Sequence, residues 1–306
     1  MAQVKTFFKK IHTESFRWYD EILIVLMLAA AMMIICGQII GALVIAPFNQ
    51  MIEKDSTGYW EMFSMYFSFI GTWVVFMIAF LIVKKDRPIL KALWTAPRGN
   101  NIKYLGIGFL IGCGLNIICA IAAILNRDIS LQYDSFHLFK LLLLLVAVFI
   151  QSSAEELVCR GFIFQRLRRG YRNPLVAIIG NALLFTSMHL FNPGASVIPM
   201  MSVLVAGLLF SLMVYYMDSI WCAMAAHTAW NYTQNVILGL PNSGLVSSVS
   251  VFKLDAASAK SSFAYNVEFG LEGSILAITV MTITGLAIII IYRKKKLLPF
   301  NPWTEV

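Results

Sequence analysis

The feature that most constrains the fold is a series of apolar segments of the length that a lipid bilayer requires. A membrane-spanning helix needs about 20 apolar residues, and eight segments meet or approach this length: 21–47, 62–83, 103–125, 138–158, 174–191, 197–216, 219–240 and 274–292. Hydrophobic residues make up 59% of the chain and charged residues 13%, and the mean hydropathy is +0.76. These values are typical of membrane proteins. The sequence therefore predicts an all-α, polytopic membrane protein with about eight transmembrane helices.

The rest of the chain favours a single membrane-embedded domain over residues 1–306. No internal repeat and no soluble domain is visible, and the first apolar segment is too long and too late for the core of a cleaved signal peptide. Gly108 and Gly112 form a small-residue face in the third segment, which predicts close helix packing. The five cysteines lie in or beside apolar segments without CxxC pairs, so buried thiols are favoured over disulfides and thiolate metal sites.

The positions of lysine and arginine predict the orientation. Most of the 24 such residues fall in four segments, the two terminal tails, 84–103 and 160–172. An eight-span chain brings these segments to one side, which the positive-inside rule assigns to the cytoplasm together with both termini. The net charge of +8 then reflects topology and contact with anionic lipid, not a nucleic-acid partner. The compact chain suggests a multi-pass protein of a bacterial cell membrane.

A few polar residues interrupt the apolar segments. A charged side chain at the bilayer centre costs about 2.5–3.5 kcal/mol on insertion scales, so such residues usually face a protein interior or a wet cavity. The spacing of Glu156 and Arg160, i and i+4 with the acid first, predicts an ion pair on one helix face. Glu155 points about 100° away from that face. The residues concerned are Glu155, Glu156 and Arg160 in the fourth segment, His189 in the fifth, and His227 and Asn231 in the seventh.

Their depth favours a functional site over separate packing roles. A lone intramembrane histidine or asparagine often only bonds to a neighbouring helix, and a Glu–Arg pair can simply join helices. Counting along each helix, however, places Glu155, His189 and His227 at compatible depths on three segments. Because Glu155 has no local cation, we expect these side chains to meet around a cavity.

Such a set of side chains can hydrolyse an amide. A carboxylate in a low-dielectric cavity can act as a general base toward water, and neutral imidazoles can orient that water or bind a divalent metal. An asparagine amide is a suitable oxyanion donor. No serine or cysteine is clearly paired with a histidine, and HExxH is absent. A metal would therefore need ligands from separate helices, with Glu155, His189 and His227 as the candidates.

Three ordered motifs carry a resemblance to a known family. EELVCR (155–160) matches EExxxR, FTSMH (185–189) matches FxxxH, and HTAWN (227–231) matches HxxxN. In this order, within an eight-span protein, they resemble the CAAX protease and bacteriocin-processing family, called CPBP or ABI, of intramembrane endopeptidases. The catalytic motif region covers about residues 138–240.

The resemblance implies a role for each motif residue. Glu155 would activate water, His189 would help to hold or polarise it, and His227 and Asn231 would stabilise the oxyanion. The supporting residues would be Glu156, Arg160 and Phe185. Family members are described both as metal-dependent and as glutamate proteases, so the cofactor stays open between a divalent metal such as zinc and none.

The substrate expected from this resemblance is a membrane-associated peptide or protein. Some relatives are linked to cleavage after a prenylated cysteine, and bacterial ones to peptide leaders, bacteriocin immunity and membrane sensor proteins. Two other functions stay open. One is a non-catalytic membrane partner or regulator, such as an immunity protein or a sensor-kinase partner. The other is a proton-coupled carrier, since intramembrane Glu and His are typical of proton relays, although the inverted repeats of many carriers are not visible.

Overall fold

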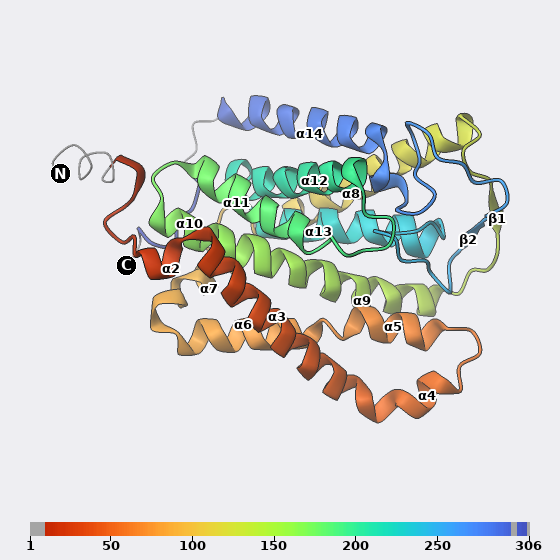
Figure 1. The fold of residues 1–306 in the computed structure, drawn as a ribbon, viewed down its shortest axis with the longest axis horizontal. Coiled ribbons are helices and arrows are strands. Elements are labelled where there is room, and N and C mark those ends of the chain that lie inside the picture. Colours follow the sequence, from red (N-terminus) through yellow and green to blue (C-terminus); the bar gives the residue numbers. More distant parts are fainter. Residues whose placement is uncertain (1–9, 295–298, 305–306) are drawn as a thin grey trace.

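The computed structural model describes residues 10–294 and 299–304, and most of them are helical (Figure 1). The long elements that build the bundle are α3 (Leu23–Ile45), α5 (Tyr59–Phe67), α6 (Ile70–Ile82), α8 (Ile102–Leu125), α9 (Leu138–Glu156), α11 (Pro174–Ser187), α12 (Val197–Tyr216), α13 (Ile220–Asn231) and α14 (Ile275–Arg293). Shorter elements connect or extend them: α2 (Trp18–Glu21), η1 (Ala46–Phe48), α4 (Asn49–Glu53), η2 (Lys84–Asp86), α7 (Pro88–Leu93), η3 (Leu157–Ile163), α10 (Phe164–Gly170), η4 (Tyr232–Ile237), η5 (Leu271–Gly273) and the strands β1 (Leu131–Tyr133) and β2 (Phe252–Leu254).

Six helical stretches of the described chain are long and apolar enough to cross a membrane. They are Leu23–Glu53, Tyr59–Ile82, Ile102–Leu125, Leu138–Gly170, Val197–Tyr216 and Ile275–Arg293. These stretches coincide with six of the eight predicted segments, and the all-α, polytopic fold is therefore confirmed. The other two predicted segments form shorter helices, α11 and α13, and α13 continues into the π-helical η4.

The predicted extent of the fifth segment, 174–191, is wrong at its end. Helix α11 stops at Ser187, and residues 188–196 form turns. Its 14 residues rise roughly 21 Å at 1.5 Å each, less than the ~30 Å of a hydrocarbon core. Pro193 lacks an N–H and Gly194 has φ +74°, so these two residues keep the chain after α11 from returning to a helix before α12. Irregular backbone at membrane depth is tolerated where it lines a cavity, which His189 does.

The elements run between two ends of an elongated bundle (Figure 1). One, here called the terminal end, carries α2, α7, α10 and the described residues 299–304. The opposite, hairpin end carries α4 and the two strands, which pair antiparallel with Gln132 opposite Lys253. Successive long helices alternate in direction, except that α5 and α6 follow one another as a single stretch. The basic segments 84–103 and 160–172 therefore meet at the terminal end, as the sequence predicts.

Helix α13, which carries the HxxxN motif, packs closely against α8. An added Cβ at Gly108 would lie 2.1 Å from the carbonyl oxygen of Cys222, and one at Gly112 would lie 2.1 Å from that of Ala226. Such distances exclude any side chain, so the predicted small-residue packing is confirmed. This contact fixes the position of α13, and thereby of His227, in the bundle.

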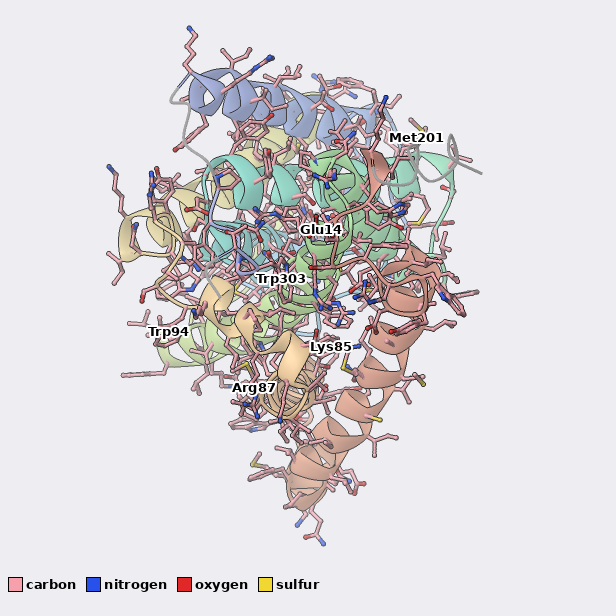
Figure 2. The ribbon with its side chains drawn as sticks, turned by 90° about the vertical axis from the view of Figure 1, so that its left-hand side faces the viewer. Glu14, Lys85, Arg87, Trp94, Met201 and Trp303 are labelled. Atoms are coloured by element: carbon pink, nitrogen blue, oxygen red, sulfur yellow. The ribbon has the colours of Figure 1, made fainter. Side chains whose placement is uncertain are left out.

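The outer surface is apolar, as expected for a protein surrounded by lipid. Helices α3 and α14 expose many large side chains, among them Ile24, Leu28, Ile35, Ile283 and Ile290. The end-on view in Figure 2 shows exposed Trp94 and Met201 on opposite flanks of the bundle. The main core instead lies around η3, α10, α12 and α13, which places the motif helices at the centre.

Candidate active site

Two of the three helices that carry a motif, α9 and α13, change from α to π geometry beside their motif residues. Helix α9 ends at Glu156 and continues as the π-helical η3, which contains Arg160. Helix α13 ends at Asn231 and continues as the π-helical η4. Hydrogen bonding from i to i+5 widens the helix, and such segments are frequent at functional sites. The motif side chains are thus presented from helices that are locally irregular.

Glu156 binds two partners deep in the bundle. Its Oε1 lies 3.0 Å from Nη1 of Arg160, and both side chains are 0% exposed. The same oxygen lies 3.0 Å from Nδ1 of His227. The predicted ion pair between Glu156 and Arg160 is therefore confirmed, and it also reaches the histidine of α13.

Arg160 is held by groups besides Glu156. Its Nη2 donates to the carbonyl oxygen of Gly207 at 2.7 Å, and its guanidinium lies 4.8 Å from the ring centroid of Phe185 and 5.4 Å from that of Phe210. A guanidinium over an aromatic face is attracted by the ring quadrupole. The phenylalanine of the FxxxH motif thus touches the arginine of the EExxxR motif.

These contacts set the orientation of the His227 ring. A carboxylate only accepts hydrogen bonds, so Nδ1 carries the proton that it donates to Glu156. The ring stacks on Phe210, with centroids 5.1 Å apart and an interplanar angle of 21°, and meets Phe185 edge-on at 5.6 Å. Its Nε2 then lies 3.8 Å from Oε2 of Glu155. Glu156 and the two phenylalanines therefore aim His227 at Glu155.

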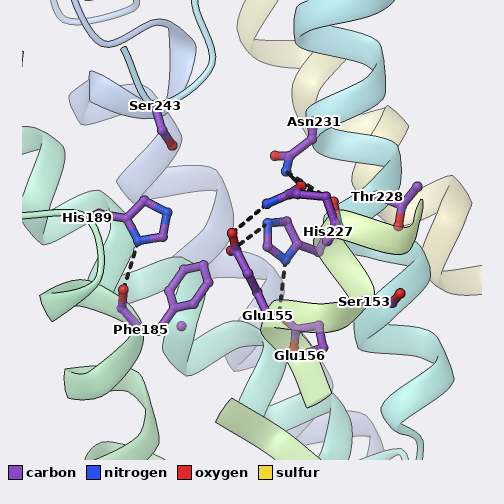
Figure 3. Close-up of polar contacts among 12 residues, drawn as sticks. Ser153, Glu155, Glu156, Phe185, His189, His227, Thr228, Asn231 and Ser243 are labelled. Atoms are coloured by element: carbon purple, nitrogen blue, oxygen red, sulfur yellow. Dashed lines mark hydrogen bonds and ion pairs between the residues drawn. The ribbon is translucent and has the colours of Figure 1, made fainter. Parts of the chain in front are cut away.

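Glu155 and Glu156 each have a buried Oε2 without a hydrogen-bond partner among the described residues, but only Glu155 lines the cavity. Oε1 of Glu155 accepts from Nε2 of Gln151, whereas its Oε2 is buried and makes no hydrogen bond with any described residue. The residue is 8% exposed and lines a cavity. Figure 3 shows its carboxylate beside the ring of His227. The unpartnered oxygen is thus available to a molecule in the cavity.

His189 approaches the same cavity from the turn after α11. Its Nδ1 lies 2.8 Å from the carbonyl oxygen of Phe185, to which it donates, and its ring lies 4.8 Å from the Phe185 ring. In Figure 3, Phe185 stands between His189 and Glu155. The backbone carbonyl thereby leaves Nε2 of His189 without a proton and able to accept a hydrogen bond.

Asn231 is bound to α9 through a residue that the sequence reasoning missed. Its Nδ2 donates to Oε1 of Gln151 at 3.3 Å and to Oγ of Ser152 at 3.2 Å. Gln151 therefore contacts both Glu155 and Asn231. The i,i+4 spacing of Gln151 and Glu155 on one helix face is the signal that could have identified it.

The cavity brings together the four predicted catalytic residues. It has a volume of about 800 Å³, and Glu155, His189, His227 and Asn231 all line it. Its walls come from α3, α5, α9, α11, α12, α13 and α14. Three further polar residues line it from the long loop after α13, namely Asn242, Ser243 and Glu272. Sequence reasoning missed them because their approach depends on the fold of that loop.

The metal-ligand candidates do not form a ligand cluster in this arrangement. Nowhere in the described ranges do three His, Cys, Asp or Glu side chains gather closely enough to hold a metal ion. Both histidines use Nδ1 for protein contacts, with Glu156 and with the Phe185 carbonyl. Glu155, His189 and His227 are therefore better described as groups around a shared space than as a preformed metal site.

The segment that carries the motifs is similar to a known family of CAAX-type proteases. Residues 137–233 match the family model described as "Type II CAAX prenyl endopeptidase Rce1-like". This segment contains all three motifs and the four predicted catalytic residues that line the cavity. The match confirms the resemblance to the CAAX protease family. No curated protein matched the chain, and no solved structure matched it.

Proposed function

We propose that the protein is an intramembrane endopeptidase that hydrolyses a peptide bond of a membrane-associated peptide or protein with water activated by Glu155. The observation that carries this proposal is the unpartnered Oε2 of Glu155, buried in an otherwise mainly apolar cavity 3.8 Å from Nε2 of His227. A general base must reach the proton that it removes, and a low-dielectric site strengthens its interaction with the reacting groups.

In the proposed first step, a water molecule binds between Glu155 and His189. Oε2 of Glu155 accepts one proton of the water, and Nε2 of His189 accepts a hydrogen bond from the other, as the carbonyl of Phe185 permits. The water oxygen then attacks the scissile carbonyl carbon. The serines near Glu155 support water as the nucleophile, since Ser152 bonds to Gln151 and Ser153 to backbone carbonyls.

In the second step, His227 and Asn231 stabilise the oxyanion. In this step, a His227 ring that carries a proton on both nitrogens before water attacks donates from Nε2 to the oxyanion and keeps that proton throughout, while Glu156 balances its charge through Nδ1. Asn231 turns its Nδ2 from Gln151 toward the oxyanion. Glu155 then returns its proton to the leaving amine. One water molecule is consumed and a carboxylic acid and an amine are released. Arg160, Glu156 and Phe185 hold the participating side chains in place.

We also propose an orientation for this single membrane-embedded domain. The described basic residues of α7, α10 and the adjoining loops lie at the terminal end, and the positive-inside rule assigns that end to the cytoplasm. Lys5 and Lys9, which the sequence adds to this side, lie outside the described residues. The substrate would then enter from the lipid or from the cytoplasmic interface of a bacterial cell membrane.

The test is a comparison of protein N-termini in cells. N-terminal peptides are quantified from membranes that carry wild type or Glu155→Gln at equal expression, and the best hit is repeated with purified proteins, with and without a chelator. A cleavage that requires Glu155 is the expected result. If no cleavage depends on Glu155 and cells with His189 or His227 variants keep the wild-type phenotype, the proposal fails and a non-catalytic partner or carrier replaces it.

A further inference from the structure

A second buried carboxylate, Glu272, lines the same cavity as Glu155. It lies in η5 near the hairpin end and is 6% exposed. None of the ion pairs among the described residues includes it. Burial raises the pKa of Glu272, and hydrogen bonds from Gln234 and Ser243 act in the opposite direction. A buried acid without a cation lowers the stability of the fold. The role of Glu272 is therefore to be found in its hydrogen bonds.

One oxygen of Glu272 binds the helix that carries His227 and Asn231. Nε2 of Gln234 donates to Oε2 of Glu272, and Gln234 lies in η4, directly after Asn231. The amide of Gln234 is itself held, because its Oε1 accepts from Nδ2 of Asn116 at 2.9 Å. This side of Glu272 is therefore joined to the rigid contact between α8 and α13.

The other oxygen binds the loop that supports His189. Oε1 of Glu272 accepts from the backbone N–H of Ser243 and from its hydroxyl, the latter at 3.1 Å. Ser243 has φ +49°, a left-handed conformation that favours glycine and needs such support. Its carbonyl accepts from Nδ2 of Asn192 at 3.1 Å, and the Asn192 N–H donates to the carbonyl of His189 at 3.1 Å. Figure 3 shows Ser243 facing His189.

We propose that Glu272 is a positioning residue that fixes His189 relative to His227 through Ser243 and Gln234. The turn that carries His189 has no helix to hold it, because α11 ends at Ser187. Besides the contacts of His189 with Phe185, a chain of bonds from Gln234 through Glu272, Ser243 and Asn192 ties this turn to the bundle. The effect of Glu272 on catalysis rests on the proposed peptidase function, whereas its effect on the position of His189 does not.

A carboxylate is the group that fits this position. Three donors converge on Glu272, two from Ser243 and one from Gln234. In Glu272→Gln, the new amide N–H would face the amide of Gln234, donor against donor, while Ser243 could keep its partner. Exchanging the two side chains, Glu272→Gln with Gln234→Glu, restores a donor opposite an acceptor at this contact. The carbonyl oxygen of Pro241, which accepts from Nε2 of Gln234, loses its donor in the exchange, so the recovery should be partial.

Two readouts test the inference with purified protein in detergent. The first is the 15N spectrum of the histidine rings. The chain has only four histidines, and the His189 signals are assigned with a His189→Gln variant. Glu272→Gln is expected to shift the His189 signals and leave those of His12 unchanged. The double variant is expected to move the His189 signals back toward their wild-type positions. Glu268→Gln, an exposed acid on the same loop, is the matched control and should change nothing.

The second readout is turnover of the substrate peptide. A misplacement of about 1 Å can cost on the order of 10²-fold in rate, so Glu272→Gln should lower kcat by one to two orders of magnitude with KM changed much less. The exchange should recover part of the loss. Unchanged His189 signals in Glu272→Gln would overturn the inference, whatever the turnover. If Glu272→Gln shifts the His189 signals and the wild-type protein cleaves no peptide, the positioning role of Glu272 is upheld and the peptidase function is refuted.

Discussion

Two clusters of buried charges lie along the continuous helix formed by α9, η3 and α10, and they are built differently. At the terminal end, Arg166 contacts several acids, and Arg169 shares one of them. Roughly 9 Å further into the bundle, at 1.5 Å per residue, Arg160 has a single acidic partner, and at roughly 16 Å Glu155 has no cation of its own. The terminal pairs are Arg166 with Asp86 (2.5 Å), Glu21 (3.1 Å) and Asp20 (3.3 Å), and Arg169 with Glu21 (3.0 Å).

The difference separates a cluster that joins segments from one that can react. Arg166 joins α2, η2 and α10, and its acids are occupied by cations. In the inner cluster, Arg160 and His227 both bind Oε1 of Glu156, whose Oε2 has no partner but does not line the cavity. Oε2 of Glu155 is also unpartnered, and Glu155 borders the cavity. Burial of charge alone therefore does not mark the active site. The mark is a buried carboxylate oxygen that the protein leaves free beside a cavity.

The largest loss of stability is expected when the inner ion pair is broken. Arg160→Ala leaves Glu156 buried without a cation, which costs about 3–5 kcal/mol, and it also releases His227, so activity should be lost. Thermal unfolding in detergent and peptide turnover measure both effects. The double variant Glu156→Gln with Arg160→Met should recover much of the stability without the activity. An unchanged melting temperature in Arg160→Ala would show that the pair contributes nothing.

Breaking the terminal cluster should affect stability but not chemistry. Arg166→Met removes charged hydrogen bonds worth about 1.5–3 kcal/mol each at most, and partly exposed Asp20 lessens the penalty. We expect the melting temperature to be lower than that of wild type. The kcat per folded molecule should stay within about twofold of the wild-type value, because Arg166→Met leaves the groups that would bind substrate or water unchanged. A kcat loss as large as that of Arg160→Ala would remove the distinction between the clusters.

A moderate loss of activity is expected for variants of Gln151. This residue holds Glu155 and Asn231 by hydrogen bonds but takes no direct part in the proposed reaction. Gln151→Leu removes the donor to Glu155 and the acceptor for Asn231. An increase of about 1.4 kcal/mol in the activation free energy lowers kcat/KM about tenfold. We expect a loss of this size, with little change in melting temperature. Gln151→Glu, which keeps the acceptor but not the donor, separates the two contacts. Wild-type kcat/KM in Gln151→Leu would exclude Gln151 from the site.

The smallest effect is expected at the rim of the terminal cluster. Burial raises the pKa of Asp20, but the Lys85 hydrogen bond and the charge of Arg166 outweigh it and hold the pKa below its ordinary 3.8. Lys85 is 39% exposed, and solvent screens such a pair. Lys85→Ala should lower the melting temperature only slightly at pH 7, and this difference should vanish as the pH falls below 3.8 and Asp20 is protonated. A drop comparable to that of Arg166→Met would contradict this ranking.

The parts of the fold and site that depend on local spacing could be predicted from the sequence. The i,i+4 spacing indicated the Glu156–Arg160 pair, the apolar lengths indicated the polytopic helical fold, and Gly108 and Gly112 indicated close packing with another helix. Each of these depends on helix geometry alone, which repeats regularly. The meeting of three motifs at one cavity followed from the comparable depth of their residues.

The remaining parts depend on contacts between segments far apart in the chain. Hydropathy alone carried the fifth segment to residue 191, although Asn192, Pro193 and Gly194 are ordinary stop signals. The π-helical segments have no sequence pattern comparable to the apolar periodicity of α-helices. Glu272 and Ser243 reach the cavity only because the loop after α13 folds back. No spacing rule predicts such an approach.

The most direct test of the central claim is the single-turnover rate of purified Glu155→Gln on the peptide identified in cells. The amide keeps the size of the side chain but cannot accept the proton of water, and a general base contributes typically 10²–10⁴-fold. The account predicts a rate lower by about that factor, with a melting temperature equal to that of wild type. A rate equal to that of wild type would rule out Glu155 as the base and contradict the account.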